Sequence, residues 1–450
     1  MKLFQNKYRD KLHRLLSIML PIIGTQIAVI GMNFFDASMS GQAGNVDLAG
    51  TAIGGNIWMP VQTGTGGILM AAMPLVANLL GAGQKQHLST VIRHGLLLAF
   101  AAALLVIGGG VLFLPSLLQT MSLEPEVYHV AIWYLASLGM GAVPFFMVIP
   151  LRCFIDTLGY TKLTMKIFLL ALPINAALNY VLIFGKLGLP RLGGIGAGLA
   201  TGLTFWLLLF MFVAVVLKLE PFSQYHVLGF IRPQWYWLKD YLRLGVPMGL
   251  AIFMETSIFG VVALFIAKFG TDVIAAHQAA LNFSSLVYMI PLSFSLASTI
   301  VVGVEYGAEN YQGAKDYTHI GLQMSLLLAG FYMGAELFAR DEIARIYTTN
   351  VHVAALVRHF LLYAVIWQVG DAVAAPIQGI LRGYKDANAA FVSMLAYWCV
   401  CLPLGLFLDY KLGHQAFSYW ESLVVGVWCS AVLLFIRMLW LQRKLERDRS

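Results

Sequence analysis

The stretch VPMGLAIFMETSIFGVVALFIA, residues 246–267, decides the fold. At about 1.5 Å per residue, a helix of this length crosses the roughly 30 Å hydrocarbon core of a bilayer. One ionisable side chain, Glu255, stands in its middle. A carboxylate at that depth costs at least about 2.5 kcal/mol, so it must face protein, water or a cation. The stretch therefore predicts a membrane helix with a functional acid inside it.

The composition indicates that the whole chain, and not only this stretch, lies largely in a membrane. Of 450 residues, 59% are hydrophobic and 11% charged, whereas soluble proteins have about 25% charged residues. The apolar runs are too long and continuous for the strands of an outer-membrane barrel. The four cysteines form no zinc pattern, and the net charge of +7 lies in loops and tails, which does not indicate nucleic-acid binding. We expect an all-α polytopic membrane protein.

Hydropathy predicts twelve transmembrane helices. Their ranges are 15–39, 52–80, 94–117, 129–150, 165–185, 194–217, 243–267, 275–303, 319–338, 356–377, 388–408 and 420–441. Most of the 29 Lys and Arg residues fall in connections on one side of these spans. By the positive-inside rule, both termini are predicted to be cytoplasmic.

The two halves of the chain read as repeats. One constant shift carries Pro21 onto Pro247, Gly81 onto Gly307 and Pro150 onto Pro376. Residues 221–242, with two prolines and several charges, read as a cytoplasmic linker. We predict an N-terminal six-helix lobe over residues 1–220 and a C-terminal six-helix lobe over residues 243–450, related by an internal repeat with a cleft between them.

Two further spans also carry a solitary acid, Asp36 and Asp371. Asn33 lies three residues before Asp36, on the same helix face, and Gln368 lies three before Asp371. Other polar side chains inside the spans are Asn175, Asn179, Thr201, Thr204, Gln278, Asn282 and Ser285. Carboxylate, amide and hydroxyl oxygens are hard ligands suited to Na⁺, and the same groups can carry a proton. Both alternatives stay open, as does simple hydrogen bonding between helices.

Aromatic and methionine side chains lie near these acids in the sequence. They are Phe34, Phe35, Trp58, Met59, Met254, Phe283, Tyr288, Met289 and Trp367. A polarizable, π-rich wall beside a carboxylate suits a flat hydrophobic cation. Packing in the core or against lipid is the alternative for each of these residues.

Four stretches carry several distinctive residues each: Asn33-Phe34-Phe35-Asp36, Phe253-Met254-Glu255, AAHQAALNFSS at 275–285 and LRGYKD at 381–386. Together they resemble the multidrug and toxic compound extrusion (MATE) family, in particular its NorM-like bacterial branch. The resemblance implies a V-shaped fold of two six-helix bundles. It also implies a multidrug efflux antiporter that exports organic cations, including hydrophobic cationic drugs and dyes, in exchange for Na⁺ or H⁺.

Carried over position by position, the resemblance implies two sets of site residues. The ion-coupling residues would be Asp36, Asn175, Asn179, Thr201, Glu255 and Asp371, with Na⁺ a candidate at Asp36 or at Glu255 and Asp371. The substrate-binding residues would be Asn33, Phe35, Trp58, Met254, Gln278, Asn282, Phe283, Tyr288 and Trp367.

Two other classes compete with the antiporter. A lipid-linked oligosaccharide flippase of the same broad superfamily needs a cavity lined by cations, whereas the intramembrane charges here are acidic. An intramembrane enzyme is disfavoured because no catalytic motif appears. We expect no enzyme activity and no cofactor, and a monomer in the cytoplasmic (inner) membrane whose partners are drugs and lipid, not nucleic acid.

Overall fold

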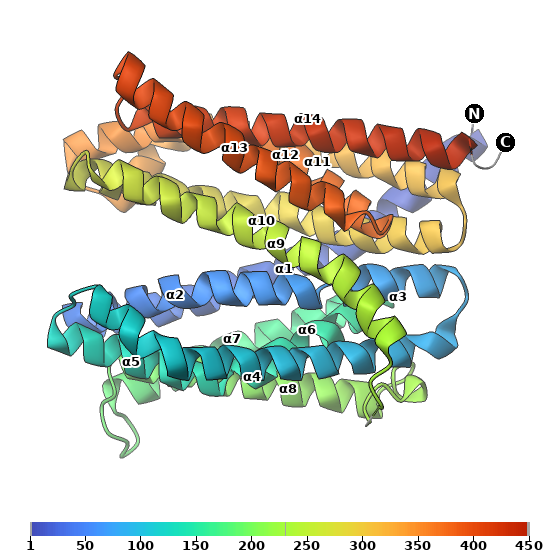
Figure 1. The fold of residues 1–450 in the computed structure, drawn as a ribbon, viewed down its shortest axis with the longest axis horizontal. Helices are drawn as coiled ribbons and strands as arrows, with labels where there is room; N and C mark the ends of the chain where they lie inside the picture. The colour runs from blue at the N-terminus through green and yellow to red at the C-terminus, as the bar shows by residue number, and fades with distance from the viewer. Residues whose placement is uncertain (1, 230, 448–450) are drawn as a thin grey trace. The chain divides into compact units, whose positions relative to one another are not determined.

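The computed structural model describes residues 2–229 and 231–447 and, within them, helices and no strands. The helices are α1 (Lys2–Ala43), α2 (Asn45–Leu69), α3 (Ala72–Gly81), α4 (Leu88–Thr120), α5 (Pro125–Met140), α6 (Ala142–Thr157), α7 (Thr161–Phe184), α8 (Gly194–Lys218), α9 (Trp235–Ala267), α10 (Thr271–Gly307), α11 (Tyr311–Tyr347), α12 (Val351–Gly383), α13 (Ala387–Leu412) and α14 (Phe417–Arg447) (Figure 1). Two 3₁₀ turns, η1 (Lys85–His87) and η2 (Ser223–Tyr225), complete the described elements.

The helices confirm the predicted all-α membrane fold. Over the described residues, eleven spans are long and apolar enough to cross a membrane, or twelve when the bent pair α5 and α6 counts as one. This pair bends by 45° around Gly141, inside the predicted span 129–150. A Cβ at Gly141 would lie 2.6 Å from the Cα of Gly202 on α8, so the break coincides with a close helix contact.

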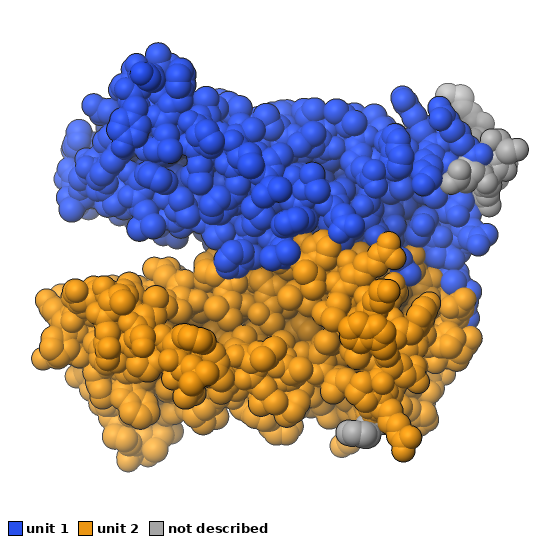
Figure 2. Space-filling view, viewed as in Figure 1, with its two compact units in different colours: residues 1–20, 81–83, 250–450 blue, residues 21–80, 84–249 orange. Residues whose placement is uncertain are grey.

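The chain forms two compact units (Figure 2). Unit 1 contains residues 1–20, 81–83 and 250–450, and unit 2 contains residues 21–80 and 84–249. This division differs from the predicted lobes because α1 and α9 are long helices that contribute residues to both units.

In unit 2, the first half of α9 packs directly on the backbone of α2. A Cβ at Gly245 would lie 2.5 Å from the carbonyl oxygen of Ile68, and one at Gly249 equally close to that of Gly64. Small residues allow membrane helices this close an approach. The Tyr241 hydroxyl fixes the contact by donating to the Leu69 carbonyl at 2.5 Å.

In unit 1, the core lies between the second half of α9 and helices α10–α14, around the buried rings of Phe360, Tyr419 and Trp420. Figure 1 shows α13 running alongside α14. Ion pairs join Lys11 to Asp316 at 2.6 Å and Lys315 to Glu446 at 2.7 Å. The N-terminal part of α1, the start of α11 and the end of α14 therefore meet at one end of unit 1.

Candidate functional site

In unit 2, two donors from two other helices hold the carboxylate of Asp36. The Asn179 amide on α7 donates to Oδ1 at 2.5 Å, and the Thr201 hydroxyl on α8 donates to Oδ2 at 2.6 Å. Hydrogen bonds to an ionised acceptor are shorter and stronger than neutral ones. Three membrane helices thus meet at one acid, which lies on α1.

The hydrogen-bond network continues from Asn179 to two further side chains of the same unit. Its Nδ2 also donates to the Asn175 Oδ1 at 3.2 Å, and the Asn175 Nδ2 donates to the Thr204 hydroxyl at 3.3 Å. Both asparagines are fully buried. The structure therefore brings together Asp36 and the three residues predicted beside it, Asn175, Asn179 and Thr201, and adds Thr204.

Glycines on α8 make this convergence possible. A Cβ at Gly196 would lie 2.8 Å from the Leu182 carbonyl oxygen on α7, and one at Gly198 would lie 2.6 Å from the Tyr134 carbonyl oxygen on α5. The glycine-rich start of α8 therefore lies against its neighbours backbone to backbone. Thr201, one turn further along α8, comes within reach of Asp36 as a result.

Some oxygen atoms around Asp36 have no hydrogen-bond partner in the described residues. They are the Asn179 Oδ1 and the Ser40 Oγ, which is four residues after Asp36 on α1. A buried polar atom without a partner costs about 1–3 kcal/mol. Together with the carboxylate, these hard oxygen atoms suit Na⁺ by donor type, and the carboxylate alone suffices for a proton.

In unit 1, Glu255 on α9 accepts a hydrogen bond from the Tyr288 hydroxyl on α10 at 2.9 Å. Arg382, near the end of α12, is 4% exposed and interacts electrostatically with Glu255. It also donates to the Gln378 Oε1 at 3.1 Å. A buried guanidinium requires a negative partner, and Glu255 supplies it.

Asp371 on α12 is 5% exposed and interacts electrostatically with Glu255. The structure therefore brings the two predicted acids of this half together. Like charges in a poorly polarizable interior repel strongly, so this pair favours binding of a cation or a proton. The described residues contain no group of three or more His, Cys, Asp and Glu side chains that could hold a metal ion.

The predicted substrate-binding residues of unit 1 are divided between its core and its surface. Met254, Phe283 and Trp367 belong to the hydrophobic core or pack against it. Asn282 and Gln278 are exposed on α10. Tyr288 serves as the donor to Glu255.

Trp367, which is predicted to contact substrate, lies in the core of unit 1. Its side chain is in the core, 7% exposed, and its indole N–H donates to the Tyr397 hydroxyl at 3.1 Å. The helical spacing that places Trp367 on the same face as Asp371 also turns it toward the neighbouring helices.

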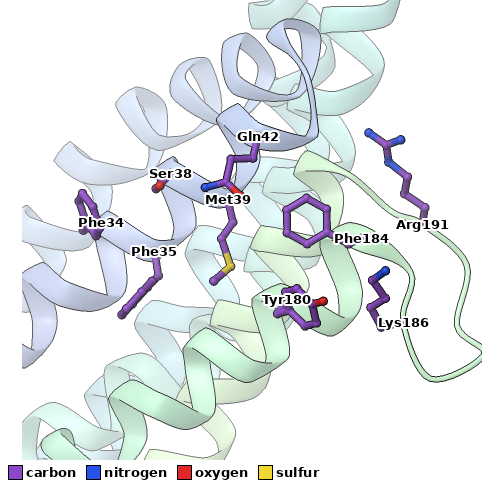
Figure 3. Close-up of a pocket in the computed structure, with 9 residues that line it drawn as sticks. All are labelled: Phe34, Phe35, Ser38, Met39, Gln42, Tyr180, Phe184, Lys186 and Arg191. Atoms are coloured by element: carbon purple, nitrogen blue, oxygen red, sulfur yellow. The ribbon is translucent and has the colours of Figure 1, made fainter.

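In unit 2, Asn33 is exposed and Trp58 packs against Phe145 and Phe146. Phe35 lines a pocket of about 550 Å³ (Figure 3). The pocket is lined by Phe34, Phe35, Ser38, Met39, Gln42, Tyr180, Phe184, Lys186 and Arg191. Because Phe35 precedes Asp36 and Tyr180 follows Asn179, this aromatic pocket adjoins the Asp36 network.

Two buried charged residues of unit 1 are not among the predicted site residues. Arg382 is 4% exposed near the end of α12. Glu336 on α11 is 3% exposed. The signal that could identify Glu336 is the one used for Asp36, an acid inside an apolar run, but Glu336 lies at the end of the predicted span 319–338 and close to the charged residue Arg340.

Sequence comparison gives a family match over most of the chain. The family model MatE matches residues 21–181 and 247–410. A relative from Geobacillus kaustophilus (strain HTA426), described as a probable multidrug resistance protein NorM, is 47% identical over 445 residues, covering 98% of this chain and 97% of the relative. A protein of the same description from Bacillus subtilis (strain 168) is 44% identical and covers 100% of both chains.

Solved structures share the fold. The eukaryotic MATE transporter AtDTX14 matches with a TM-score of 0.87 at 19% identity, covering 98% of this chain and 99% of its own. A multidrug resistance MATE family transporter in an outward-facing conformation matches with a TM-score of 0.88 at 18% identity, covering 97% of this chain and 96% of its own. At these identities the likeness shows the architecture alone.

Proposed function

Because this chain belongs to the MatE family, we propose that it is a multidrug efflux antiporter that exports hydrophobic cationic drugs and dyes in exchange for Na⁺ or H⁺. The observation that carries this proposal is Asp36, an acid within a membrane helix, held by Asn179 and Thr201 from two other helices. A protein retains such a costly group within the bilayer when an ion or a charged substrate uses it.

Competition at the acids accounts for exchange. When Na⁺ or H⁺ binds Asp36, it neutralises the charge that attracts a cationic drug, so drug and ion exclude each other. The aromatic pocket beside Asp36, with Phe35 and Tyr180 on its wall, supplies apolar and π-rich surface for the drug's flat body. In unit 1, Glu255 and Asp371 provide a second acidic site of the same kind.

The remaining expectations follow from the antiporter proposal. The chain works as a multi-pass protein of the cytoplasmic membrane, with both termini in the cytoplasm and as a monomer surrounded by lipid. It needs no cofactor, binds no nucleic acid and catalyses no covalent reaction. The preference of Lys and Arg for one side of the spans supports this orientation.

The proposal predicts that Asp36→Asn strongly reduces drug efflux. Asparagine keeps the size of the side chain but removes its charge, and losing a charge-assisted interaction costs about 1.5–3 kcal/mol. Efflux of ethidium or a rhodamine dye from cells that express the variant should fall roughly tenfold or more. The matched control is Asp10→Asn, because Asp10 is an exposed acid on the same helix. Efflux by Asp36→Asn at the wild-type rate, with equal protein in the membrane, would overturn the proposal.

A further inference from the structure

Glu336 is a buried acid that the exchange mechanism described above does not use. It lies on α11 with 3% exposure, interacts with the Gln368 side chain on α12 as a hydrogen-bond partner, and forms no ion pair with any described residue. An ionised carboxylate without a counter-charge is very costly in a dry interior. The group is therefore stable in this position when it carries a proton.

The polar groups beside Glu336 come from two helices. Gln368 on α12 is 2% exposed, and its side chain interacts with Glu336 as a hydrogen-bond partner. The Tyr332 hydroxyl, four residues before Glu336 on α11, is buried without a hydrogen-bond partner in the described residues and interacts electrostatically with Glu336. The buried acid therefore has an amide and a hydroxyl beside it but no counter-charge, which is unusual for a purely structural site.

No described cation forms an ion pair that would balance the negative charge of an ionised Glu336. Arg340 is one turn further along α11, but Glu336 forms no ion pair with it or with any other described cation. The Tyr332 hydroxyl interacts electrostatically with both Glu336 and Asp371, which lies on α12. The other ionisable groups that interact electrostatically with Asp371 are Glu255 on α9, Tyr288 on α10 and Tyr397 on α13.

The polar groups form a series along the helices. At about 1.5 Å per residue, Glu336 is about 16 Å from Tyr347 at the end of α11. Asp371 is about 30 Å from Val351, where α12 begins after a short turn. Glu336 therefore lies closer to this turn than Asp371 does, with Tyr332 and Gln368 between them.

We propose that Glu336 is a further proton-binding residue of this transporter, which takes up a proton and passes it to Asp371. The inference rests on the proposed antiport and narrows the coupling ion of unit 1 to H⁺. In the transfer, the Glu336 carboxyl group loses its O–H proton and becomes a carboxylate, while the Asp371 carboxylate gains a proton and becomes neutral. The Tyr332 hydroxyl can rotate, accept a proton on its oxygen and release its own.

Glu336→Gln tests the role in transport. Glutamine mimics the shape of the protonated acid but cannot release a proton. In proteoliposomes, dye movement driven by a pH gradient should fall at least tenfold, while dye-for-dye exchange at equal pH on both sides should stay within twofold of wild type. Glu342→Gln is the control, because Glu342 is an exposed acid on the same helix. Unchanged pH-driven transport, or an equal loss of both activities, would overturn the proposal.

Infrared spectroscopy tests proton binding without any transport. The wild-type protein at neutral pH should show a protonated-carboxyl band that is absent from Glu336→Gln and retained in Glu342→Gln. Absence of this band from the wild-type spectrum would mean that Glu336 is ionised and would overturn the proposal. If wild type moves dye with a Na⁺ gradient only, the relay is wrong while the antiport stands. If it moves dye with neither gradient, the proposed function fails and the infrared result still decides whether Glu336 holds a proton.

Discussion

Each oxygen of the Asp36 carboxylate accepts one hydrogen bond from a neighbouring helix. Removing either donor should therefore alter the affinity of this site for a competing cation. Thr201 donates to Oδ2, whereas Asn179 donates to Oδ1 and also to Asn175. The Thr201 hydroxyl is the cleaner probe because no other hydrogen bond of the described network depends on it.

Thr201→Val should remove the hydrogen bond to the Asp36 carboxylate while preserving the shape of the side chain. A hydrogen bond to a charged group contributes about 1.5–3 kcal/mol, so the dissociation constant for the coupling ion should change roughly tenfold. Ion-dependent quenching of tryptophan fluorescence in purified protein measures this. The control is Thr120→Val, because the Thr120 hydroxyl bonds only to the Leu117 carbonyl of its own helix. Identical ion affinities in both variants would contradict the assigned role of Thr201.

Sequence spacing could predict the Asp36 site because its residues stand out individually. An acid, two asparagines four residues apart and a threonine after a glycine run are each rare in apolar helices. Arg382 and Glu336 could not be assigned in this way. Whether a charge near the end of a helix is buried depends on which neighbours cover it, and neighbours are set by packing rather than by local hydropathy.

At the scale of single helices, α1 contains a proline where the chain passes from one compact unit to the other. The first segment of unit 1 ends at Leu20, and unit 2 begins at Pro21. Proline has no N–H and so leaves the carbonyl one turn earlier without its helical donor. The Thr25 hydroxyl donates to the Pro21 carbonyl at 3.1 Å, which adds a further local adjustment to the helix.

Pro21→Ala should impair transport more than it impairs folding. Alanine restores the missing donor and removes a penalty of about 3 kcal/mol for proline inside a helix, so the melting temperature should stay equal or rise. Dye efflux should fall several-fold if α1 must bend there. Pro115→Ala in α4 is the control, because Pro115 also lies inside a helix. Wild-type efflux by Pro21→Ala would contradict a hinge at this position.

The break between α5 and α6 gives a second test at the scale of elements. Gly141 lies against Gly202, whereas Gly139, two residues earlier, has open space around it. Gly141→Val should force α6 and α8 apart at a cost of about 1–3 kcal/mol and lower the melting temperature in detergent. Gly139→Val should leave the melting temperature nearly unchanged. Equal effects of the two substitutions would contradict this packing.

Hydropathy predicted where the spans lie but not how far their helices extend. The apolar run 319–338 belongs to a helix that continues to Tyr347, and Glu342 pairs with Arg345 on its exposed end at 2.9 Å. Likewise, α1 begins at Lys2, well before the predicted start at residue 15. Charged turns outside the bilayer remain helical because their backbone hydrogen bonds continue, and hydropathy does not detect this.

At the scale of the whole molecule, the internal repeat is the strongest prediction made from the sequence. The two segments matched by the MatE model begin at residues 21 and 247, which are the first pair of prolines aligned by the constant shift. The compact units could not be predicted in the same way, because α1 and α9 each belong partly to both units.

Exchange in proteoliposomes tests the central claim most directly. Vesicles that contain the purified protein are loaded with a cationic dye and diluted into buffer that imposes an inward gradient of either H⁺ or Na⁺. One of these gradients should accelerate dye efflux from vesicles with wild-type protein and leave vesicles with Asp36→Asn unaffected. If neither gradient accelerates efflux, or if the Asp36→Asn protein responds as wild type does, then competition between drug and ion at this acid is wrong.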